Sequence, residues 1–434
     1  MYDETTPDGG RQVQHVLPVR LPNSDVQIAR GVRAGPWVFA TGQAGTDYVN
    51  GLAPEVAQSG HPLNGEPKGK REARRIYRNV QEVLAAGGSS LDRVVRVDQY
   101  YTRPQVVDPY HEVRREVFNG RIPPSTSNLH QRLAIAGQEI ELQVIAAATD
   151  GPDPQHEAFS PSYAIHSSSG YSPALRCGPL RFIPGQTAEA RDEGEPGVDP
   201  LAQPSRGLWK GTPIKLETDF IIQNKMIPSL QACGCGLEDV VKAQVYLRDA
   251  DDVPAFNEVW AKHFPEPPAT TIIPTADPGF IIPGSRIEIN VIATDRAKAP
   301  KQVVSVPDSP MFSGWTHAVR CGDLLFLSGL MGIDAAGLVA TARGSAGFPF
   351  HQNRLRAEMD AIIAQAETIC AAAGTSLRNA VRIQQFHTRL DDLGTSVDVW
   401  SQAVGGALPL SAVEVPWLPL PGARVLVDLW CYCP

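Results

Sequence analysis

Asp428 is the side chain of this sequence best suited by type and setting to transfer a proton. It is a lone acid among alternating apolar residues in the stretch RVLVDLWCYCP at 424–434. Two similar stretches earlier in the chain carry the amides Gln143 and Asn290 at the matching place. Amides hydrogen-bond but do not exchange protons at neutral pH, whereas apolar surroundings raise the pKa of a carboxyl group toward useful values. Asp428 is therefore either a general acid/base or one end of a structural ion pair.

Two further side chains of the C-terminal third could assist Asp428. Glu414, in the strand-like stretch SAVEV, could form a carboxylate pair with it. His317 could shuttle protons at neutral pH, and the alternative is a histidine whose ring is satisfied by local hydrogen bonds. These residues predict proton-transfer chemistry on a small molecule.

A strand that ends in a small residue and a glycine occurs three times in the chain. The copies read GPWVFATGQAG at 35–45, GPLRFIPGQTA at 178–188 and GDLLFLSGLMG at 322–332, with central glycines Gly42, Gly185 and Gly329. The glycines are 143 and 144 residues apart. A backbone N–H at such a turn could bind a carbonyl oxygen, or the glycine could serve a β-bulge.

The same elements follow each glycine strand. An amphipathic helix stops at a glycine, which suits a left-handed cap, and a short polar turn leads into an alternating strand. A second helix follows, reading DPYHEVRREVF, PAFNEVWAKHF and GTSVDVWSQAV in the three copies, and a final strand closes each one. Each unit thus runs strand, strand, helix, strand, helix, strand, strand, which predicts an α+β fold.

Segments rich in Gly, Pro, Asp and Ser separate the copies and predict units at 1–155, 156–302 and 303–434. A unit of ~145 residues can bury a core of its own. Three equal units with short joins predict a closed pseudo-trimeric ring, a covalent version of a trimer, with sheets facing the centre and helices outside. A solenoid is disfavoured because solenoid repeats are usually ~20–50 residues long. We expect a monomer or a dimer of chains in solution.

Composition disfavours several classes of protein. Lys+Arg 39 against Asp+Glu 47 gives a formal net charge of -8, without the basic stripe typical of nucleic-acid binding. No apolar stretch approaches the ~18 residues of a membrane span, and the start MYDETTPDGG lacks a secretory signal. Seven cysteines, an odd number, predict reduced thiols in a cytoplasmic protein. The sequence has no HExxH, paired C-x-x-C or phosphate-loop motif, so neither a metal nor another cofactor is expected.

The repeated strands, helices and glycines together resemble the reactive-intermediate deaminase family, RidA/YjgF, and the resemblance occurs once per unit. The second unit is the most similar, with DVVKAQVYL, PAFNEVWAKHF, PPATT and IEINVIA. The resemblance implies a chorismate-mutase-like unit, a mixed sheet with two helices on one face, and clefts at the interfaces between neighbouring units.

The resemblance also implies a carboxylate-binding arginine after Pro-Ala, which this chain lacks in all three units. The matching places are Thr270 in the second unit, Ser125 or Thr126 in the first, and Leu410 or Ser411 in the third. A forked guanidinium holds both carboxylate oxygens, and neutral side chains do not replace it. The substrate is then one without an α-carboxylate, or one held in another way.

Further site residues come from the same resemblance. The family's acid in the last strand aligns with Gln143, Asn290 and Asp428, and the family's cleft aromatic with Tyr171 and Trp315, but with Ile28 in the first unit. The Ser328-Gly329 strand end would orient the substrate. Among the three clefts, the one that the third unit's residues line therefore has the best set.

We therefore expect a hydrolase or deaminase acting on an imine, enamine or related C–N bond of a small metabolite. Asp428 and Ser328 would be catalytic. Substrate binding would fall to Gly329, Trp315, Tyr171, Glu414, His317, Asn290 and Gln143. The alternative is a non-catalytic protein that binds a small metabolite; ribonuclease activity, suggested by some relatives, is disfavoured by the negative charge.

Overall fold

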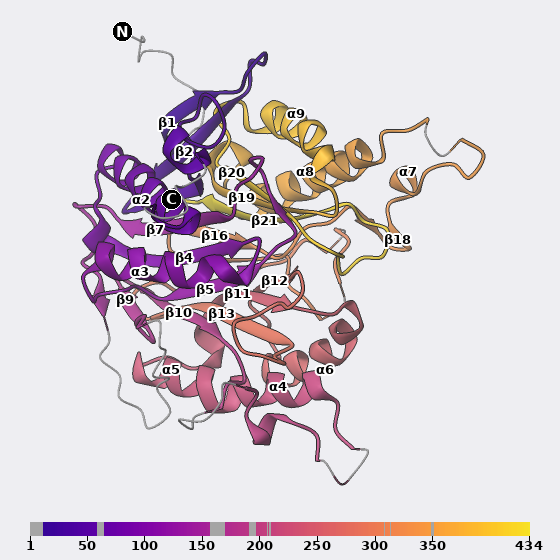
Figure 1. Cartoon of the computed structure of the whole chain (residues 1–434). Helices are drawn as coiled ribbons and strands as arrows, with labels where there is room; N and C mark the ends of the chain where they lie inside the picture. The colour runs from indigo at the N-terminus through magenta and orange to yellow at the C-terminus, as the bar shows by residue number, and fades with distance from the viewer. Residues whose placement is uncertain are drawn as a thin grey trace.

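Three mixed sheets with the same core strand order carry the fold, in a computed structural model (Figure 1). It describes residues 12–58, 65–156, 170–190, 197–205, 207, 210–307, 309–312, 314–348 and 351–434. The strand orders are β1-β2-β3-β7-β4-β5, then β8-β9-β10-β13-β11-β12, and β14-β15-β16-β21-β19-β20-β6. The first, second and third units are the parts of the chain that form these three sheets, in this order. The repeat seen in the sequence is thus a repeat of structure.

The bounds of the elements follow the order expected from the sequence. The first unit contains β1 (Gln14–Arg20), β2 (Gln27–Ala34), β3 (Trp37–Ala44), α1 (Pro54–Ala57), α2 (Lys68–Ala86), β4 (Val94–Tyr101), α3 (Val107–Phe118), β5 (Ser125–Leu129), β6 (Arg132–Leu133) and β7 (Ile140–Ala147). The second contains β8 (Gln155–His156), β9 (Leu175–Cys177), β10 (Leu180–Gln186), α4 (Pro213–Ile221), η4 (Ile222–Met226), α5 (Ile227–Ala232), β11 (Val240–Leu247), α6 (Val253–His263), β12 (Ala269–Pro274) and β13 (Ile287–Thr294). The third contains β14 (Lys301–Val304), β15 (Ala318–Cys321), β16 (Leu324–Leu327), β17 (Ile333–Asp334), β18 (Gly337–Leu338), α7 (Ala340–Arg343), α8 (Arg354–Ala372), β19 (Ala380–His387), α9 (Leu393–Val404), β20 (Leu410–Glu414) and β21 (Val425–Tyr432).

Helix α2 shows how each unit closes one face of its sheet. Its apolar residues recur at helical spacing, and the stripe Ala73, Ile76, Val80 and Leu84 is buried, with the helix in contact with β3 and β7. The glycine just beyond the helix, Gly88, has φ +75°.

The glycines at the same place in the other units, Gly234 and Gly374, have φ +74° and +83°. The left-handed caps predicted from the sequence are therefore present in all three units, where a side chain would be strained.

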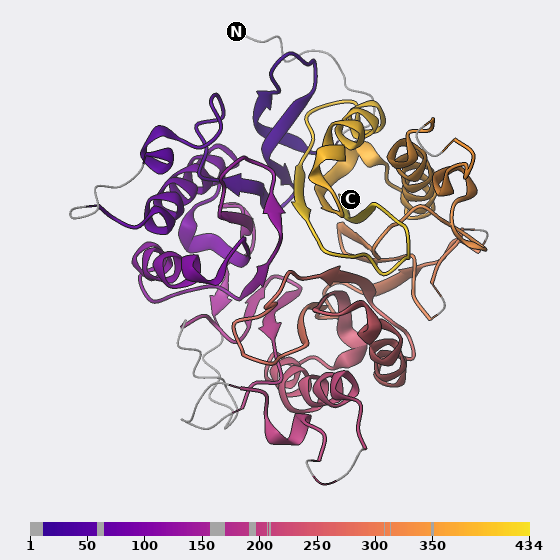
Figure 2. The ribbon, with the colours of Figure 1, turned by 45° about the vertical axis from the view of Figure 1, so that its right-hand side comes forward.

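The opposite faces of the three sheets meet in one apolar cluster. Equivalent residues of the glycine strands, Phe39, Phe182 and Phe326, lie in it together. Figure 2 shows the three units around a common centre. The contacts run in order: β5 touches β10, β12 touches β16, and β20 of the third unit touches β3 of the first. Each unit therefore contacts both of the others.

Three short strands depart from the predicted units. β8 straddles the boundary expected between 155 and 156 and belongs to the second sheet. β14 begins at Lys301, two residues before the boundary expected at 303, and pairs with β15 in the third sheet. β6 belongs to the first unit by sequence but joins the third sheet, where Leu133 pairs with Val413 and Arg132 with Glu414. The first and third units thus share a sheet.

A buried glutamate of the first long helix caps the last strand in every unit. Glu72 accepts from the backbone N–H groups of Glu139 and Ile140, at 2.9 and 3.1 Å. Glu217 and Glu358 do the same for Arg286 and Arg424, at 2.9 and 2.7 Å. Burial raises the pKa of these carboxyl groups, to about 6 for Glu72 and about 7 for Glu217 and Glu358.

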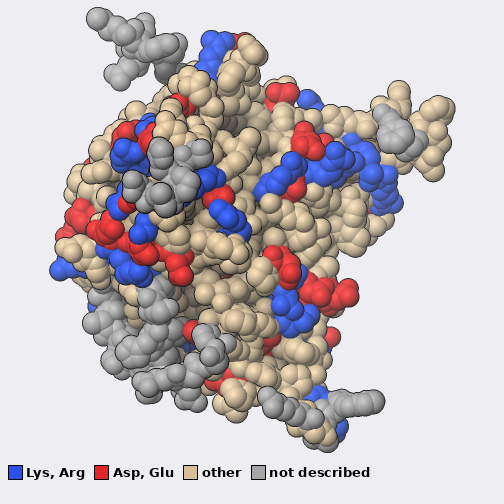
Figure 3. Space-filling view, viewed as in Figure 1, with Lys and Arg blue, Asp and Glu red and all other residues tan. Residues whose placement is uncertain are grey.

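Charged side chains of both signs are interspersed on the face shown in Figure 3. Many of them pair locally, as Arg74 does with Glu66 and Glu116 at 3.2 and 2.6 Å. Among the described helices, none combines the length and apolarity that a membrane crossing needs.

The cysteines lie in the interior. All seven are buried as free thiols. Cys370 Sγ and Cys431 Sγ are 3.8 Å apart in the core of the third unit. Reduced thiols, expected from the odd cysteine count, stay a prediction that thiol titration of the unfolded, unreduced protein can test.

Candidate functional site

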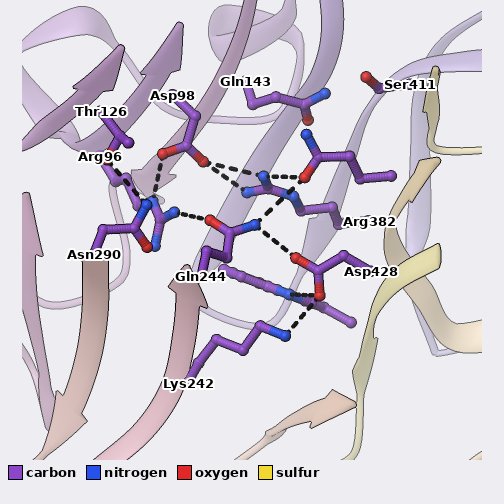
Figure 4. A network of polar contacts seen from close by, with 12 residues as sticks. Arg96, Asp98, Thr126, Gln143, Lys242, Gln244, Asn290, Arg382, Ser411 and Asp428 are labelled. Atoms are coloured by element: carbon purple, nitrogen blue, oxygen red, sulfur yellow. Dashed lines mark hydrogen bonds and ion pairs between the residues drawn. The ribbon is translucent and has the colours of Figure 1, made fainter. Parts of the chain in front are cut away.

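Asp428 lies in a buried polar network where the three sheets meet (Figure 4). Equivalent strands supply one basic residue each to this network: Arg96 on β4, Lys242 on β11 and Arg382 on β19. Two residues further along each strand stand Asp98, Gln244 and Gln384, which complete the network. Arg382 donates to Asp98 at 3.0 Å and thereby links the third unit to the first.

The carboxylate of Asp428 has a full set of partners. Lys242 Nζ lies 2.7 Å from Oδ1, and Gln244 Nε2 donates to Oδ2 at 2.6 Å. Thr271 Oγ1 and Trp430 Nε1 each donate to Oδ1 at 3.2 Å. Both charged side chains have no exposed surface. This is the geometry of the structural ion pair that the sequence left as the alternative for Asp428.

The expected direction of the Asp428 pKa is wrong. Burial favours the neutral form, but attraction to Lys242 and Arg382, with hydrogen bonds from Lys242 and Gln244, leaves the pKa of Asp428 below its usual value. A carboxylate held ionised and sealed from solvent is poorly placed to exchange protons with a ligand. The cause missed by sequence reasoning is Lys242, which comes from another unit.

Two other predicted residues, Ser328 and His317, are occupied by hydrogen bonds within the protein. Ser328 Oγ donates to the carbonyl of Thr316 at 2.6 Å and accepts from the N–H of Thr270 at 2.9 Å. The ring of His317 contacts the carbonyl of Ser309 at 3.1 Å and the N–H of Val306 at 3.4 Å, as in the alternative of a satisfied histidine.

Glu414 does not pair with Asp428. Its Oε2 lies 2.6 Å from Nη2 of Arg132 and accepts from the N–H of Leu390 at 2.8 Å. Along β19, Glu414 pairs with His387 and Asp428 with Gln384, so the two acids sit at different levels of the sheet. The predicted carboxylate pair is therefore wrong.

The strand register aligns the residues that were compared with the family's arginine position in the three units. Thr270 pairs with Ala243 on β11, and the equivalent residues of β4 and β19, Val97 and Ile383, pair with Ser125 and Leu410. Of the two alternatives named for the first unit and for the third, Ser125 and Leu410 thus share the register of Thr270.

Each glycine strand ends beside the last strand of a unit. The residue that the glycine meets there comes two positions before the one predicted to hold the acid. β3 and β10 are irregular beside Gly42 and Gly185, so the bulge expected as an alternative role for the glycine is present in both. A Cβ on Gly185 would lie 1.8 Å from Oε1 of Glu288, and a Cβ on Gly329 would lie 2.9 Å from Cδ1 of Leu426. The residue that faces each glycine is therefore Glu288 or Leu426, not Asn290 or Asp428.

With this register, the position that faces each glycine is two residues earlier on the last strand than expected, so the acids belong to different units than the sequence predicted. The equivalent residues are Glu141 on β7, Glu288 on β13 and Leu426 on β21. The cleft between the second and third units has Trp315, whose Nε1 donates to Asn257 at 3.4 Å, and Gly329, but it presents a leucine where the other two have a carboxyl group. The cleft expected to be best is thus the one without an acid.

The cleft between the first and second units holds a cavity of about 150 Å³. Its lining combines polar groups from both units: Asp108, His111, Arg114, Ser125 and Ser127 from the first, and Tyr171, Gly185, Thr187, Glu189 and Glu288 from the second, with Val107, Ile281 and Ile282. Tyr171, one of the predicted aromatic residues, is in place, bridged to Ile122 of the first unit.

Glu288 is the strongest candidate for acid/base chemistry in this cavity. Burial raises its pKa to about 8, against a hydrogen bond from the Ser127 backbone that lowers it and the charge of Asp98 that raises it further. The carboxyl group is therefore largely protonated at neutral pH and can give up a proton.

Thr126 ties the two units together beside Glu288. Its Oγ1 accepts from the N–H of Gly185 at 3.1 Å and from Nδ2 of Asn290 at 3.0 Å. Asn290, predicted to bind substrate, thus holds Thr126 in the wall of the cleft, two residues from Glu288 on the same face of β13.

The interface between the third and first units has a second buried acid. Glu141 Oε1 accepts from Ser411 Oγ at 2.5 Å and from Gln143 Nε2 at 3.3 Å. Burial raises the pKa of Glu141 to about 7. Gln143, another predicted binding residue, is here a partner of Glu141.

A repeated signal in the sequence could have identified both acids. EIELQ and RIEIN carry a glutamate at the same place in two of three units, whereas an acid at the place of Asp428 occurs once. Arg114 and His111 had no such signal, because neither other unit has an arginine or a histidine at the equivalent places of the second helix. Among the described residues, no cluster of His, Cys, Asp or Glu is arranged to hold a metal ion.

Stability should fall as the pH rises above 7. The buried glutamates with raised pKa values bind protons more tightly when folded, so their contribution is full below the unfolded pKa of 4.5 and is lost as pH passes through about 6–8. Buried histidines with lowered pKa values, such as His111, oppose this trend mainly below about pH 6.5. We expect the unfolding free energy to decrease by roughly 2 kcal/mol from pH 7 to 8.5.

Urea denaturation at these two pH values measures the change. Glu288→Gln is the informative variant, because it removes the group with the highest raised pKa and should flatten the profile. An unfolding free energy that rises between these two pH values would contradict the raised pKa values of the buried glutamates.

A family model described as Endoribonuclease L-PSP matches residues 21–148, 220–295 and 308–432. Protein mmf2, mitochondrial, of Schizosaccharomyces pombe is 31% identical over 126 residues, which cover 29% of this chain and 87% of that protein. A RutC family protein of Pyrococcus horikoshii is 37% identical over 97 residues, covering 22% of this chain and 65% of its own length. The crystal structure of yeast Mmf1 matches 31% of this chain and 94% of its own, at 24% identity and a TM-score of 0.26.

Proposed function

We propose a function from the premise that this chain belongs to the Endoribonuclease L-PSP family, the RidA/YjgF family that its sequence resembles. The protein hydrolyses an imine or enamine of a small metabolite in the cavity between the first and second units. The observation that carries the proposal is Glu288, a buried carboxyl group with a raised pKa that faces a glycine backbone in this cavity.

The chemistry needs one group that both gives and accepts a proton. Glu288 protonates the enamine carbon, or the nitrogen of an imine, and an iminium ion results. Water adds to the carbon of the C=N bond, and its proton returns to the Glu288 carboxylate to give a carbinolamine. Glu288 then gives a proton to the amino group as the C–N bond breaks, and it takes one back from the hydroxyl group as the C=O bond forms. The products are a carbonyl compound and ammonia, so one water is consumed and Glu288 is regenerated.

The architecture supports the same proposal. We propose that units at 1–155, 156–302 and 303–434 form a pseudo-trimeric ring, whose three interfaces have diverged into one cavity with Glu288, one cleft with Glu141 and one with Leu426. The cyclic contacts between the units support the ring. One chain then supplies all three interfaces without an oligomeric partner.

Turnover tests the function against the alternative of a binding protein. Imines generated in situ by an amino acid oxidase can be trapped with semicarbazide, and the protein at substoichiometric concentration should lower the semicarbazone yield by hydrolysing the imine first. A binding protein would lower the yield only in proportion to its own concentration. Such a stoichiometric effect would contradict the proposed function.

A further inference from the structure

A buried arginine and a buried histidine of helix α3 line the cavity that contains Glu288. Arg114 has no exposed surface, and its guanidinium lies 5.9 Å from the centre of the Tyr110 ring. Its Nη1 donates to Ser125 Oγ at 3.0 Å and to Gln99 Oε1 at 3.3 Å. Ser125 and Ser127 also line the cavity, so the guanidinium sits among hydroxyl groups.

His111 adds a second polar group to the same wall. It is 7% exposed and lines the cavity, and its Nε2 has no hydrogen-bond partner among the described residues. A buried polar atom without a partner is costly, and a ligand that supplies one relieves that cost. His111 and Arg114 are three residues apart on α3 and therefore share a face of the helix.

The equivalent helices of the other two units carry different residues at these places. At the eighth position of the equivalent helices, Arg114 corresponds to Trp260 and Trp400, which are both buried. At the fifth position, His111 corresponds to Asn257 and Val397. Since burying a guanidinium is costly and tryptophan serves in the other two units, the charge at 114 calls for a ligand-related reason.

We propose that Arg114 and His111 form an anion-recognising subsite that selects a small ligand bearing a carboxylate. The ligand carboxylate would take the place of the Ser125 hydroxyl as an acceptor for Nη1 of Arg114, and Ser125 could then donate to the ligand. The second carboxylate oxygen would accept from His111 Nε2–H. The reacting end of the ligand would lie toward Glu288 and Gly185.

The subsite depends on the proposed function in one respect, which is that both proposals place the ligand in the same cavity. It also gives a physical reason why the substrate could carry a carboxylate although the strand position holds Ser125. The cation comes from helix α3 of the first unit and approaches the oxygen of the very residue that replaces the arginine.

Binding of benzoate and benzamide tests the inference without any turnover. The two probes share a planar ring and differ in a carboxylate against a neutral amide. We expect calorimetry to show wild-type protein binding benzoate at least tenfold more tightly than benzamide, since charge-assisted hydrogen bonds are about twice as strong as neutral ones. The His111 ring resonances should shift in NMR spectra as benzoate is added.

Arg114→Trp is the matched variant, because the residue introduced is the native one at the equivalent places. It should abolish the preference for benzoate, and the analogous conservative change Arg114→Lys should reduce it if Arg114→Trp does not fold. An unchanged preference in a folded variant, or no binding of benzoate at millimolar concentration, would overturn the proposal. Equal competition by inorganic phosphate would overturn its selectivity for a carboxylate.

The two proposals fail in different ways. Carboxylate-dependent binding without imine turnover would leave the subsite standing and remove the hydrolase. Turnover of neutral and carboxylated imines at equal rates would leave the hydrolase standing and remove the subsite.

Discussion

Replacing Glu288 by glutamine is expected to slow imine hydrolysis by a factor of about 10²–10⁴ while the protein keeps its fold. Burial holds the carboxyl group largely protonated at pH 7, so glutamine differs from it mainly by lacking a transferable proton. The amide oxygen can still accept the hydrogen bond from the Ser127 backbone. The loss should appear in kcat, with the thermal unfolding midpoint at pH 7 little changed.

Glu141→Gln is the matched control for this variant. Glu141 occupies the same place on β7, is equally buried and also has a raised pKa, but it lies in the cleft between the third and first units. We expect its replacement to change kcat by much less than tenfold. Equal losses in the two variants would mean that both clefts work, and full activity in Glu288→Gln would move the chemistry away from this cavity.

Replacing Asp428 by asparagine is expected to destabilise the fold by about 3–5 kcal/mol. The change would leave the ammonium group of Lys242 buried without its counter-charge, 2.7 Å from a neutral amide. The midpoint of urea denaturation at constant slope measures the loss. An unchanged midpoint would show that the buried pair contributes little.

A double-mutant cycle with Lys242→Met separates the pair from its surroundings. In the Lys242→Met background the lysine charge is gone, so Asp428→Asn should cost far less there, or even stabilise the protein. The folded fraction of Asp428→Asn should retain its activity, because Asp428 does not line the cavity. A loss of turnover larger than the loss of folded protein would instead favour the catalytic role first predicted for this residue.

The repeat made most of the fold predictable from the sequence. Gly42, Gly185 and Gly329 mark equivalent strands, and the glycines after the long helices adopt the left-handed conformation that a helix end requires. Such features depend on neighbours along the chain, and their physics is local. The boundary strands β6, β8 and β14 were missed because short strands carry little pattern of their own.

The site was harder to predict because two different environments lie on one face of the last strand. Asn290 and Glu288 both point to the same side of β13. Asn290 lies near the centre of the three sheets, whereas Glu288, two residues earlier, lines the cavity between the first and second units. Which of them meets a ligand depends on residues more than a hundred positions away, such as Thr126 and Ser127. Asp428 was misjudged for the same reason, because Lys242 is supplied by another unit.

The polar network at the centre has a consequence for the history of this chain. Three identical subunits would repeat every residue around their axis, so three copies of Asp98 or three of Lys242 would have to share one dry space. The fused chain instead sets Arg96, Lys242 and Arg382 against Asp98, Asp428 and two glutamines. The second unit could not form such a ring from copies of itself, because three Lys242 side chains would meet with only Gln244 and Asn290 beside them and no acid. The second unit therefore depends on Asp428 of the third unit to neutralise its buried ammonium group, and its fusion to that unit guarantees the partner.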